Sequence, residues 1–385
     1  MPELVPFRGI RFSHDLTPAG AEICPPYDVI DPEQHARLLE VHEHNAVRMV
    51  LGDDPKRPQG TPGEYRDRGK QARAWLEEGI LVRDAAPGYT LYEYQFTNMH
   101  GDRCSYRGVM GAAKAKPWGE GVLRHEEIRP KVVDDRFSLL KESGIDGGVV
   151  QLVDEGLAPA LEPFFQAAGD PILDADDFRG DHHRMWIVSD PTPVEQLKTL
   201  FAPRQAIVAD GHHRYTTALR LGADDPRPGA GHVLTVIGDL AQEGLRIEPT
   251  HRILRFEGGD KAGMDLVNRL ASLDTDEGED WSLELANGYH TAGRTPIDLS
   301  LPTFASRIAD LWGDEFEIEN WHDLGAARAR LEEIGAGALL CVLPPVSREE
   351  FWSRCSRGEV FPPKTTYFEP KISTGMVIRL IEEEL

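Results

Sequence analysis

The stretch IVADGHHRYTTAL, residues 207–219, decides both the fold class and the place of a candidate site. The apolar residues 206–209 predict a buried strand, Asp210 and Gly211 predict a turn, and residues 215–219 predict the start of a helix. The ionisable residues between strand and helix therefore lie where unpaired N–H groups and the helix dipole favour an anion. The stretch predicts a phosphate or other anion site.

The residue types in this turn suit that role. Arg214 can bind a phosphate through two N–H groups, and His212 or His213 can donate a hydrogen bond. Gly211 lets the backbone approach a ligand closely. The alternative is that Asp210 caps the helix and that the histidines are surface groups.

Further sequence patterns typical of strands and helices surround this stretch. Residues 89–96 and 105–115 predict an antiparallel hairpin, and short apolar runs predict the further strands 148–154, 184–190, 206–210 and 232–240. Helical patterns at 158–168 and 194–202 separate them. We therefore expect an α+β (mixed α/β) fold.

The length of 385 residues predicts more than one domain. We expect a phosphate-binding core with insertions at 1–257, an accessory α+β lobe at 258–345 and a C-terminal segment, 346–385, that returns to the core. Within the lobe we predict a polar loop at about 283–295. Near the C-terminus the apolar pattern predicts a helix at 376–383.

Composition excludes several functions. The formal net charge of −23 disfavours nucleic acid and anionic lipid as partners. Four widely spaced cysteines argue against a disulfide scaffold, and no apolar run is long enough to cross a membrane. The N-terminal residues do not resemble a signal peptide. We expect a cytoplasmic protein of undetermined oligomeric state.

Two further segments offer carboxylates. In RHEEIRPKVVDDR, residues 124–136, His125 and Glu126 stand among basic groups, so Glu126 is a candidate general base; the alternative is a solvated, charged helix start. Asp28 follows two prolines in PPYDVI and could hold Mg²⁺ or a substrate amine, or could simply cap the helix that Asp31 and Pro32 begin.

Two more segments offer cations. His251 and Arg252 follow an apolar strand and could join an anion pocket, although a structural role is the alternative. The segment 362–371 combines two lysines with hydroxyl groups on a loop that proline constrains, which suits a phosphate cradle. Its candidate ligand-binding residues are Lys364, Thr365, Thr366, Tyr367 and Lys371.

The DGHHR turn after a buried strand resembles the signature of the ParB and sulfiredoxin-like superfamily, which includes free serine kinases. The whole chain resembles the family called domain of unknown function 1015. The segments that carry this resemblance are CPPYDVI, RHEEIRPKVVDDRFSLL, HRMWIVSD, VADGHHRYTTAL, EPTHRILR and FPPKTTYFEPKISTG, between residues 24 and 375. The likeness implies a ParB/sulfiredoxin-like core, ATP or ADP with Mg²⁺, and ligand-binding roles for residues 210–214.

These observations favour a nucleotide-dependent phosphotransferase that acts on a small hydroxyl metabolite such as serine. We take Asp28, Glu126 and Asp210 as its candidate catalytic residues. The sequence contains no Walker-type phosphate loop, so the nucleotide site must be of another kind. The alternatives are a ParB-like nucleotide-binding switch without turnover and a phosphatase that uses the same pocket.

Overall fold

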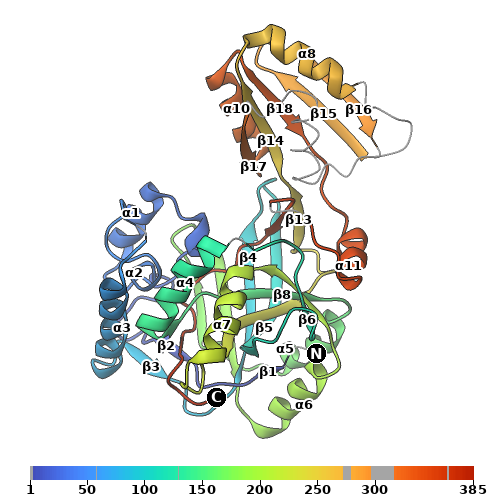
Figure 1. The fold of residues 1–385 in the computed structure, drawn as a ribbon. Helices are drawn as coiled ribbons and strands as arrows, with labels where there is room; N and C mark the ends of the chain where they lie inside the picture. The colour runs from blue at the N-terminus through green and yellow to red at the C-terminus, as the bar shows by residue number, and fades with distance from the viewer. Residues whose placement is uncertain (1–2, 58, 129, 272–278, 296–315, 362–363) are drawn as a thin grey trace. The chain divides into compact units, whose positions relative to one another are not determined.

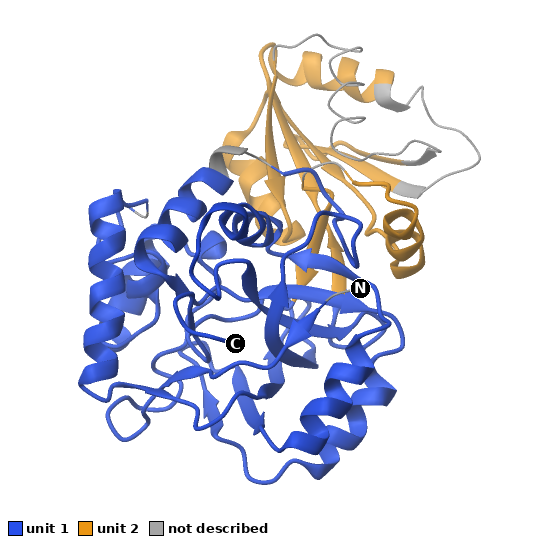
Figure 2. Ribbon diagram, turned by 60° about the horizontal axis from the view of Figure 1, so that its bottom comes forward, with its two compact units in different colours: residues 1–245, 370–385 blue, residues 246–369 orange. Residues whose placement is uncertain are grey.

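The computed structural model describes residues 3–57, 59–128, 130–271, 279–295, 316–361 and 364–385. The chain forms two compact units, which Figure 2 colours separately. Unit 1 comprises Met1–Leu245 and Pro370–Leu385, and unit 2 comprises Arg246–Glu369. Unit 2 thus begins before and ends after the accessory lobe that the sequence predicts at 258–345.

Unit 1 is built on a nine-stranded sheet of order β6-β11-β8-β12-β5-β4-β10-β9, with β1 paired to β5. Figure 1 labels β1, β4, β5, β6 and β8 of this sheet. Its strands are β1 (Leu4–Val5), β4 (Tyr89–Thr97), β5 (Arg103–Lys114), β6 (Val122–Leu123), β8 (Val150–Asp154), β9 (Leu173–Asp176), β10 (His182–Val188), β11 (Ala206–Asp210) and β12 (His232–Asp239). The pairs β6–β11 and β8–β12 are parallel, whereas β8–β11, β5–β12 and β4–β5 are antiparallel. This mixed sheet with its helices confirms the α+β class and the predicted hairpin.

Unit 1 contains further short strands and a set of helices. The short strands are β2 (Ile10–Phe12), β3 (Leu81–Arg83), β7 (Ile145–Asp146) and β20 (Arg379–Leu380). The helices are the 3-10 turn η1 (Tyr27–Val29), α1 (Pro32–Val41), α2 (Val47–Val50), α3 (Pro62–Glu77), α4 (Pro130–Ser143), α5 (Ala158–Ala167), α6 (Pro191–Phe201) and α7 (His212–Asp224). Helix α4 packs between α3 and α7, and α7 packs against β8 and β12.

The core of unit 1 follows from the strand patterns. Residues 206–209 of β11 are almost fully buried, as are Leu152 of β8 and Ile237 of β12. Of these, Ala206, Val208, Leu152 and Ile237 pack with Tyr215 and Ala218 of α7 and with Phe201 of α6 in one hydrophobic cluster. The sheet and its helices therefore hold the β11–α7 turn on a rigid support.

The C-terminal segment is extended rather than helical, so the predicted helix at 376–383 is wrong. Residues 376–381 are all nearly inaccessible to solvent. The Ile378 N–H donates to the carbonyl of Ile10, and the Ile381 N–H donates to that of Gly144. Arg379 donates to the Asp146 carboxylate over 2.7 Å. Burial on all sides and these long-range partners override the local helical pattern.

Unit 2 contains a five-stranded antiparallel sheet of order β16-β15-β18-β14-β17. Its elements are β13 (Arg246–Pro249), β14 (His251–Phe256), α8 (Gly259–Ala271), β15 (Glu279–Leu285), β16 (His290–Thr295), β17 (Phe316–Trp321), α10 (Leu324–Ile334), β18 (Ala338–Val342), α11 (Arg348–Ser356) and β19 (Thr366–Glu369). The predicted polar loop at 283–295 is wrong, because β15 and β16 form a hairpin there.

The two helices beside this sheet contact opposite faces. Leu254 and Leu339 pack with α8, whereas the adjacent residues Ile253 and Leu340 pack with α10. Successive side chains of a strand point to opposite faces, so both faces of these strands are apolar. None of the helices within the described ranges has the length and apolar character needed to span a membrane.

Candidate anion-binding site

The β11–α7 turn forms the centre of the candidate site in unit 1. Gly211 is the N-cap of α7, with φ 97° and ψ 25°, and the helix begins at His212 rather than near Tyr215 as predicted. His212, His213 and Arg214 therefore occupy the first helical turn. The backbone N–H groups of a first turn lack partners within the helix, so this turn can accept an anion.

Gly211 is required here for two reasons. Its φ lies in the left-handed region, which side chains disfavour. A Cβ at this position would also lie 3.1 Å from Val150 Cγ2 and 3.1 Å from Arg214 Nε. The absence of a side chain thus lets the turn pack closely against β8 and against the Arg214 side chain.

Asp210 lies at the end of β11 and binds two cations. Its carboxylate accepts a hydrogen bond from Lys371 Nζ over 2.7 Å and another from Arg214 Nη2. No side chain caps α7, so Asp210 does not have the capping role of the alternative interpretation. Lys371 and Arg214 thus place two cations beside the N-terminus of α7, where the helix dipole also favours a bound anion.

The electrostatics of Asp210 limit its chemistry. Burial acts to raise the pKa of its carboxyl group, but the charges of Lys371 and Arg214 outweigh burial and hold the pKa well below its usual range. A carboxylate that remains ionised at all working pH values is a poor general base. Its contacts instead suit the positioning of the two cations.

His125 and His212 form a buried pair on the other side of the turn. The His125 N–H donates to His212 Nε2 over 3.3 Å, and His125 Nδ1 donates to the carbonyl of Val208 over 2.6 Å. Burial lowers the pKa of both imidazoles, and their mutual repulsion lowers that of His212 further. Both rings are therefore neutral at neutral pH and support the turn. His213 is half-buried, which makes it the more accessible histidine of the motif.

Arg214 is held on several sides. Besides its bond to Asp210, its Nη1 donates to the carbonyl of Val149 over 2.7 Å. Its guanidinium lies 5.9 Å from the ring centroid of Tyr27, and that of Arg136 lies 4.2 Å from the same centroid. The sequence interpretation did not single out Tyr27, although it quoted the segment that contains it.

The two other carboxylate candidates also belong to unit 1. Asp28 lies in η1, is exposed, and contributes to the raised pKa of Arg214. It does not cap α1, because the Asp31 side chain accepts the Gln34 N–H over 2.8 Å. Glu126 is half-buried and its charge acts on His125. The predicted site residues of unit 1 therefore gather around the start of α7.

The remaining candidates belong to unit 2. Arg252 is fully buried, donates to the carbonyls of Thr250 and Lys364, and has its pKa lowered by burial to about 10. Lys364 itself is exposed and has a φ of 65°. Arg252 thus holds the backbone of the lysine-bearing loop from within.

The side chains around that loop are also ordered. The Tyr367 ring stacks on His322 with centroids 4.0 Å apart, and Thr366 begins β19. His251 accepts the Leu343 N–H through Nδ1, and burial lowers its pKa to about 4. Thr365 is half-buried beside Lys364. These contacts give His251 and Arg252 structural roles within unit 2.

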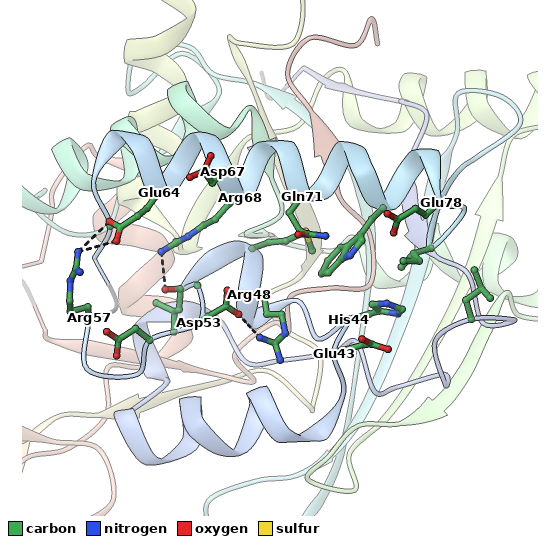
Figure 3. Close-up of a pocket in the computed structure, with 18 residues that line it drawn as sticks. Glu43, His44, Arg48, Asp53, Arg57, Glu64, Asp67, Arg68, Gln71 and Glu78 are labelled. Carbon is green, nitrogen blue, oxygen red and sulfur yellow. Dashed lines mark hydrogen bonds and ion pairs between the residues drawn. The ribbon is translucent and has the colours of Figure 1, made fainter.

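A cavity of about 1120 Å³ lies elsewhere in unit 1, beside α3 (Figure 3). Six carboxylates and three guanidinium groups line it. Arg48 and Arg57 pair with Asp53 and Glu64, and Arg68 donates to main-chain carbonyls of the loop before α3. This lining disfavours a phosphate, although the volume would suffice for a nucleotide. None of the predicted site residues lines this cavity.

The side chains that could coordinate a metal ion are dispersed over the described residues. Across the described ranges, no group of three or more His, Cys, Asp or Glu side chains is arranged to hold a metal ion. Mg²⁺ in nucleotide-dependent enzymes commonly needs one or two carboxylates together with substrate phosphates. Asp28 and Glu126 are the unit 1 candidates for such a contact.

Sequence reasoning missed three features of this region. Thr217 is buried and lies three residues after Arg214, so both occupy one face of α7. Gly147 and Gly148 line one small cavity with Arg214 and Thr217, and a Cβ on Gly148 would lie 3.1 Å from Arg214 Cδ. The helical spacing could have indicated Thr217, whereas the two glycines carried no local signal.

Comparison with solved structures finds distant similarities. A conserved hypothetical protein from Pyrococcus furiosus is 16% identical, with 69% of this chain and 92% of that chain covered and a TM-score of 0.36. A free serine kinase in complex with AMP is 14% identical, with 68% and 86% covered and a TM-score of 0.37. SbnI with a C-terminal truncation, from Staphylococcus aureus, is 11% identical, with 70% and 86% covered and a TM-score of 0.41.

Comparison with protein families gives a firmer assignment. No curated protein matches the sequence. The family model described as protein of unknown function (DUF1015) matches residues 4–287, which is well over half of the chain. The protein therefore belongs to the DUF1015 family.

Proposed function

We propose that this protein is a nucleotide-dependent phosphotransferase that acts on a small hydroxyl metabolite such as serine. The observation that carries the proposal is the start of α7, where the left-handed Gly211 precedes the first-turn N–H groups and Lys371 and Arg214 both bind Asp210. Such a site suits the charged oxygens of a phosphate chain.

Each residue of unit 1 has a role in this proposal. The first-turn N–H groups of α7 and the side chain of His213 bind phosphate oxygens. Lys371 and Arg214 neutralise the charge that develops during transfer, and Asp210 positions both. The neutral His125–His212 pair supports the turn from within the core.

The transfer step needs a base other than Asp210. The acceptor hydroxyl oxygen forms a bond to the terminal phosphorus while the bond from that phosphorus to the bridging oxygen of the nucleotide breaks. The hydroxyl proton passes to a carboxylate, for which Glu126 and Asp28 are the candidates. When bound, Mg²⁺ would supply further charge neutralisation on the phosphates, with one of these carboxylates as a ligand.

The central experiment follows phosphorus by NMR. The protein is incubated with Mg²⁺, ATP or ADP and a panel of hydroxy compounds that includes serine. We expect a new phosphomonoester resonance that requires both the nucleotide and the acceptor. Nucleotide binding without this resonance would support the switch instead, and phosphate release from a phosphoester alone would support the phosphatase.

A pair of lysine variants tests the site itself. Lys371→Gln removes the cation that binds the Asp210 carboxylate over 2.7 Å at the site. Lys198→Gln removes a cation that forms an equally short ion pair with Glu195 on the solvent-exposed side of α6. We expect calorimetry to show nucleotide affinity at least tenfold weaker for Lys371→Gln and unchanged for Lys198→Gln. Equal affinities in both variants would remove the α7 site from consideration.

A further inference from the structure

A small cavity lies beside the candidate site in unit 1. Its volume is about 60 Å³, and its lining combines part of α4, part of α7 and the glycine pair before β8. The residues of this lining that matter here are Tyr27, Arg136, Gly147, Gly148, Arg214 and Thr217. It therefore shares Arg214 with the α7 site but extends away from the turn toward α4.

The hydroxyl group of Thr217 indicates that the cavity takes a polar ligand. Thr217 is only 2% exposed, and its Oγ1 atom has no hydrogen-bond partner among the described residues. A buried hydroxyl without a partner is costly, because it has lost its bonds to water. A ligand atom that bonds to Oγ1 within this cavity would remove that cost.

The charge of the lining favours an anion. Two guanidinium groups, those of Arg136 and Arg214, face one carboxylate, that of Asp146. Asp146 already binds Arg379 over 2.7 Å and accepts the Leu234 N–H over 2.7 Å. The Asp146 carboxylate is therefore neutralised within the core. Arg136 and Arg214 are paired in turn with Asp135 and Asp210, so a ligand meets guanidinium N–H donors and no unpaired carboxylate of the lining.

Both guanidinium groups are held in place and retain donors. Arg136 donates to Asp135 through Nε and Nη2, and Arg214 uses Nη1 and Nη2 for Val149 and Asp210. A guanidinium has five N–H donors, so these bonds leave others for a ligand. Fixed arginines of this kind are well suited to carboxylate recognition.

The size of the cavity limits the ligand. A volume of about 60 Å³ accommodates a few water molecules or one carboxylate group. Pockets that enclose a whole drug-sized molecule occupy several hundred Å³ or more. A purine base or a sugar phosphate does not fit, so this cavity is not the nucleotide subsite.

We infer that this cavity binds the carboxylate group of a small acid, and that Arg136, Arg214 and Thr217 donate hydrogen bonds to it. The assignment of that acid as the phosphoryl acceptor rests on the proposed function. In that case the acceptor is a hydroxy acid or hydroxy amino acid, and Arg214 links its carboxylate to the adjacent phosphate site.

The first test compares ligands on the unaltered protein. Calorimetry without nucleotide measures binding of L-serine, L-glycerate and acetate, and of L-serinamide, in which an amide replaces the carboxylate. We expect L-serine to bind at least tenfold more tightly than L-serinamide. Equal affinities, or no binding of any of these acids, would overturn the inference and leave a cavity that holds only water.

A threonine variant with a matched control tests the lining. Thr217→Val removes the buried hydroxyl with little change of shape, whereas Thr216→Val alters the neighbouring residue, whose hydroxyl donates to the His212 carbonyl and does not line the cavity. We expect three- to tenfold weaker serine binding for Thr217→Val and no change for Thr216→Val. If Thr217→Val fails to fold, the comparison of serine with serinamide still decides.

Arginine replacements complete the design. Arg136 and Arg220 each lie 4.2 Å from an aromatic ring centroid and each bind an aspartate, but only Arg136 lines the cavity. We expect Arg136→Lys to weaken serine binding at least tenfold and Arg220→Lys to leave it unchanged. An equal response of both variants would contradict the assignment.

These measurements separate the two proposals. Saturable binding of acids without any phosphoryl transfer would retain the carboxylate site and reject the phosphotransferase. Transfer to hydroxyl compounds regardless of a carboxylate would retain the phosphotransferase and reject the carboxylate site.

Discussion

Gly211 combines two constraints in one residue, a left-handed backbone and a close approach to β8. Changing it to alanine should cost about 1–2 kcal/mol of unfolding free energy from the backbone alone. The added Cβ should also weaken nucleotide binding at least tenfold, because it presses on Val150 and on Arg214 Nε and so displaces the guanidinium of the site. Urea denaturation and calorimetry with ADP measure the two effects.

Gly101 supplies the control for that substitution. Its φ is 86°, but no atom lies within 4 Å of a Cβ built there. Gly101→Ala should therefore share the backbone cost and leave nucleotide affinity unchanged. Nucleotide affinity that stays at the unaltered value in Gly211→Ala would contradict the proposed cradle.

Buried histidines predict how stability depends on pH. Burial lowers the pKa of His232 from 6.5 to about 4. Between these values the unfolded chain binds the proton more readily than the folded protein, so this group makes stability fall as pH decreases from about 6.5 to 4. Urea denaturation across this range should show the decline, and His232→Gln should reduce it.

His14 should have the opposite effect. Its bond to Glu22 raises its pKa, so its contribution to stability is present below pH 6.5 and is lost as pH rises through the raised value. His14→Gln should therefore lower the free energy of unfolding by a constant amount below pH 6.5 and remove the loss of stability that occurs as pH rises above 6.5. A decline that both substitutions reduce equally would show that these assignments are wrong.

At the scale of elements, the start of α1 distinguishes the roles of two aspartates, either of which could cap the helix on sequence grounds. Asp31 accepts the Gln34 N–H at the helix start, whereas Asp28 lies exposed in η1. Asp31→Ala should lower the unfolding free energy by about 1 kcal/mol, the usual cost of a lost N-cap. Asp28→Ala should change it by less than about 0.5 kcal/mol, as exposed substitutions do.

Denaturant titrations of both variants measure this difference. A loss of stability with Asp28→Ala equal to that with Asp31→Ala would mean that η1 contributes to the cap.

The element scale also shows where pattern reasoning is reliable. Strands β4, β5, β8, β11 and β12 were predictable because their apolar residues are buried in the sheet where the chain pattern places them.

At the scale of the molecule, the chain leaves and re-enters unit 1 at one paired position. Arg246 of β13 pairs with Glu369 of the antiparallel strand β19. Paired residues of this kind lie about 5 Å apart, so a linker of about four residues should be able to replace 246–369. We expect that shortened protein to unfold cooperatively and to give a dispersed NMR spectrum.

A second truncation provides the contrast. A chain that ends at residue 245 lacks the segment 370–385, and with it the Arg379–Asp146 ion pair and the β20–β7 pairing. Breaking a buried ion pair alone typically costs about 3–5 kcal/mol. This truncation should therefore fail to fold. Equal folding of both shortened proteins would mean that the C-terminal segment is dispensable.

The sequence by itself determined the fold class, six of the nine strands of the large sheet in unit 1 and the strand–turn–helix around Gly211. These features depend on periodicity and on residues close in the chain, which a single sequence displays. It also predicted anion-binding roles for Lys371 and for the DGHHR turn, without relating one to the other.

Only the tertiary structure decided which residues meet. Lys371 lies 161 positions from the Asp210 carboxylate that it binds, and Arg379 is held in an extended, buried segment against the helical preference of its neighbours. Contacts over such separations depend on how the whole chain packs, because local propensity is small compared with burial and ion pairing in a core. The same packing created the cavity beside Thr217, which no local pattern in the sequence indicates.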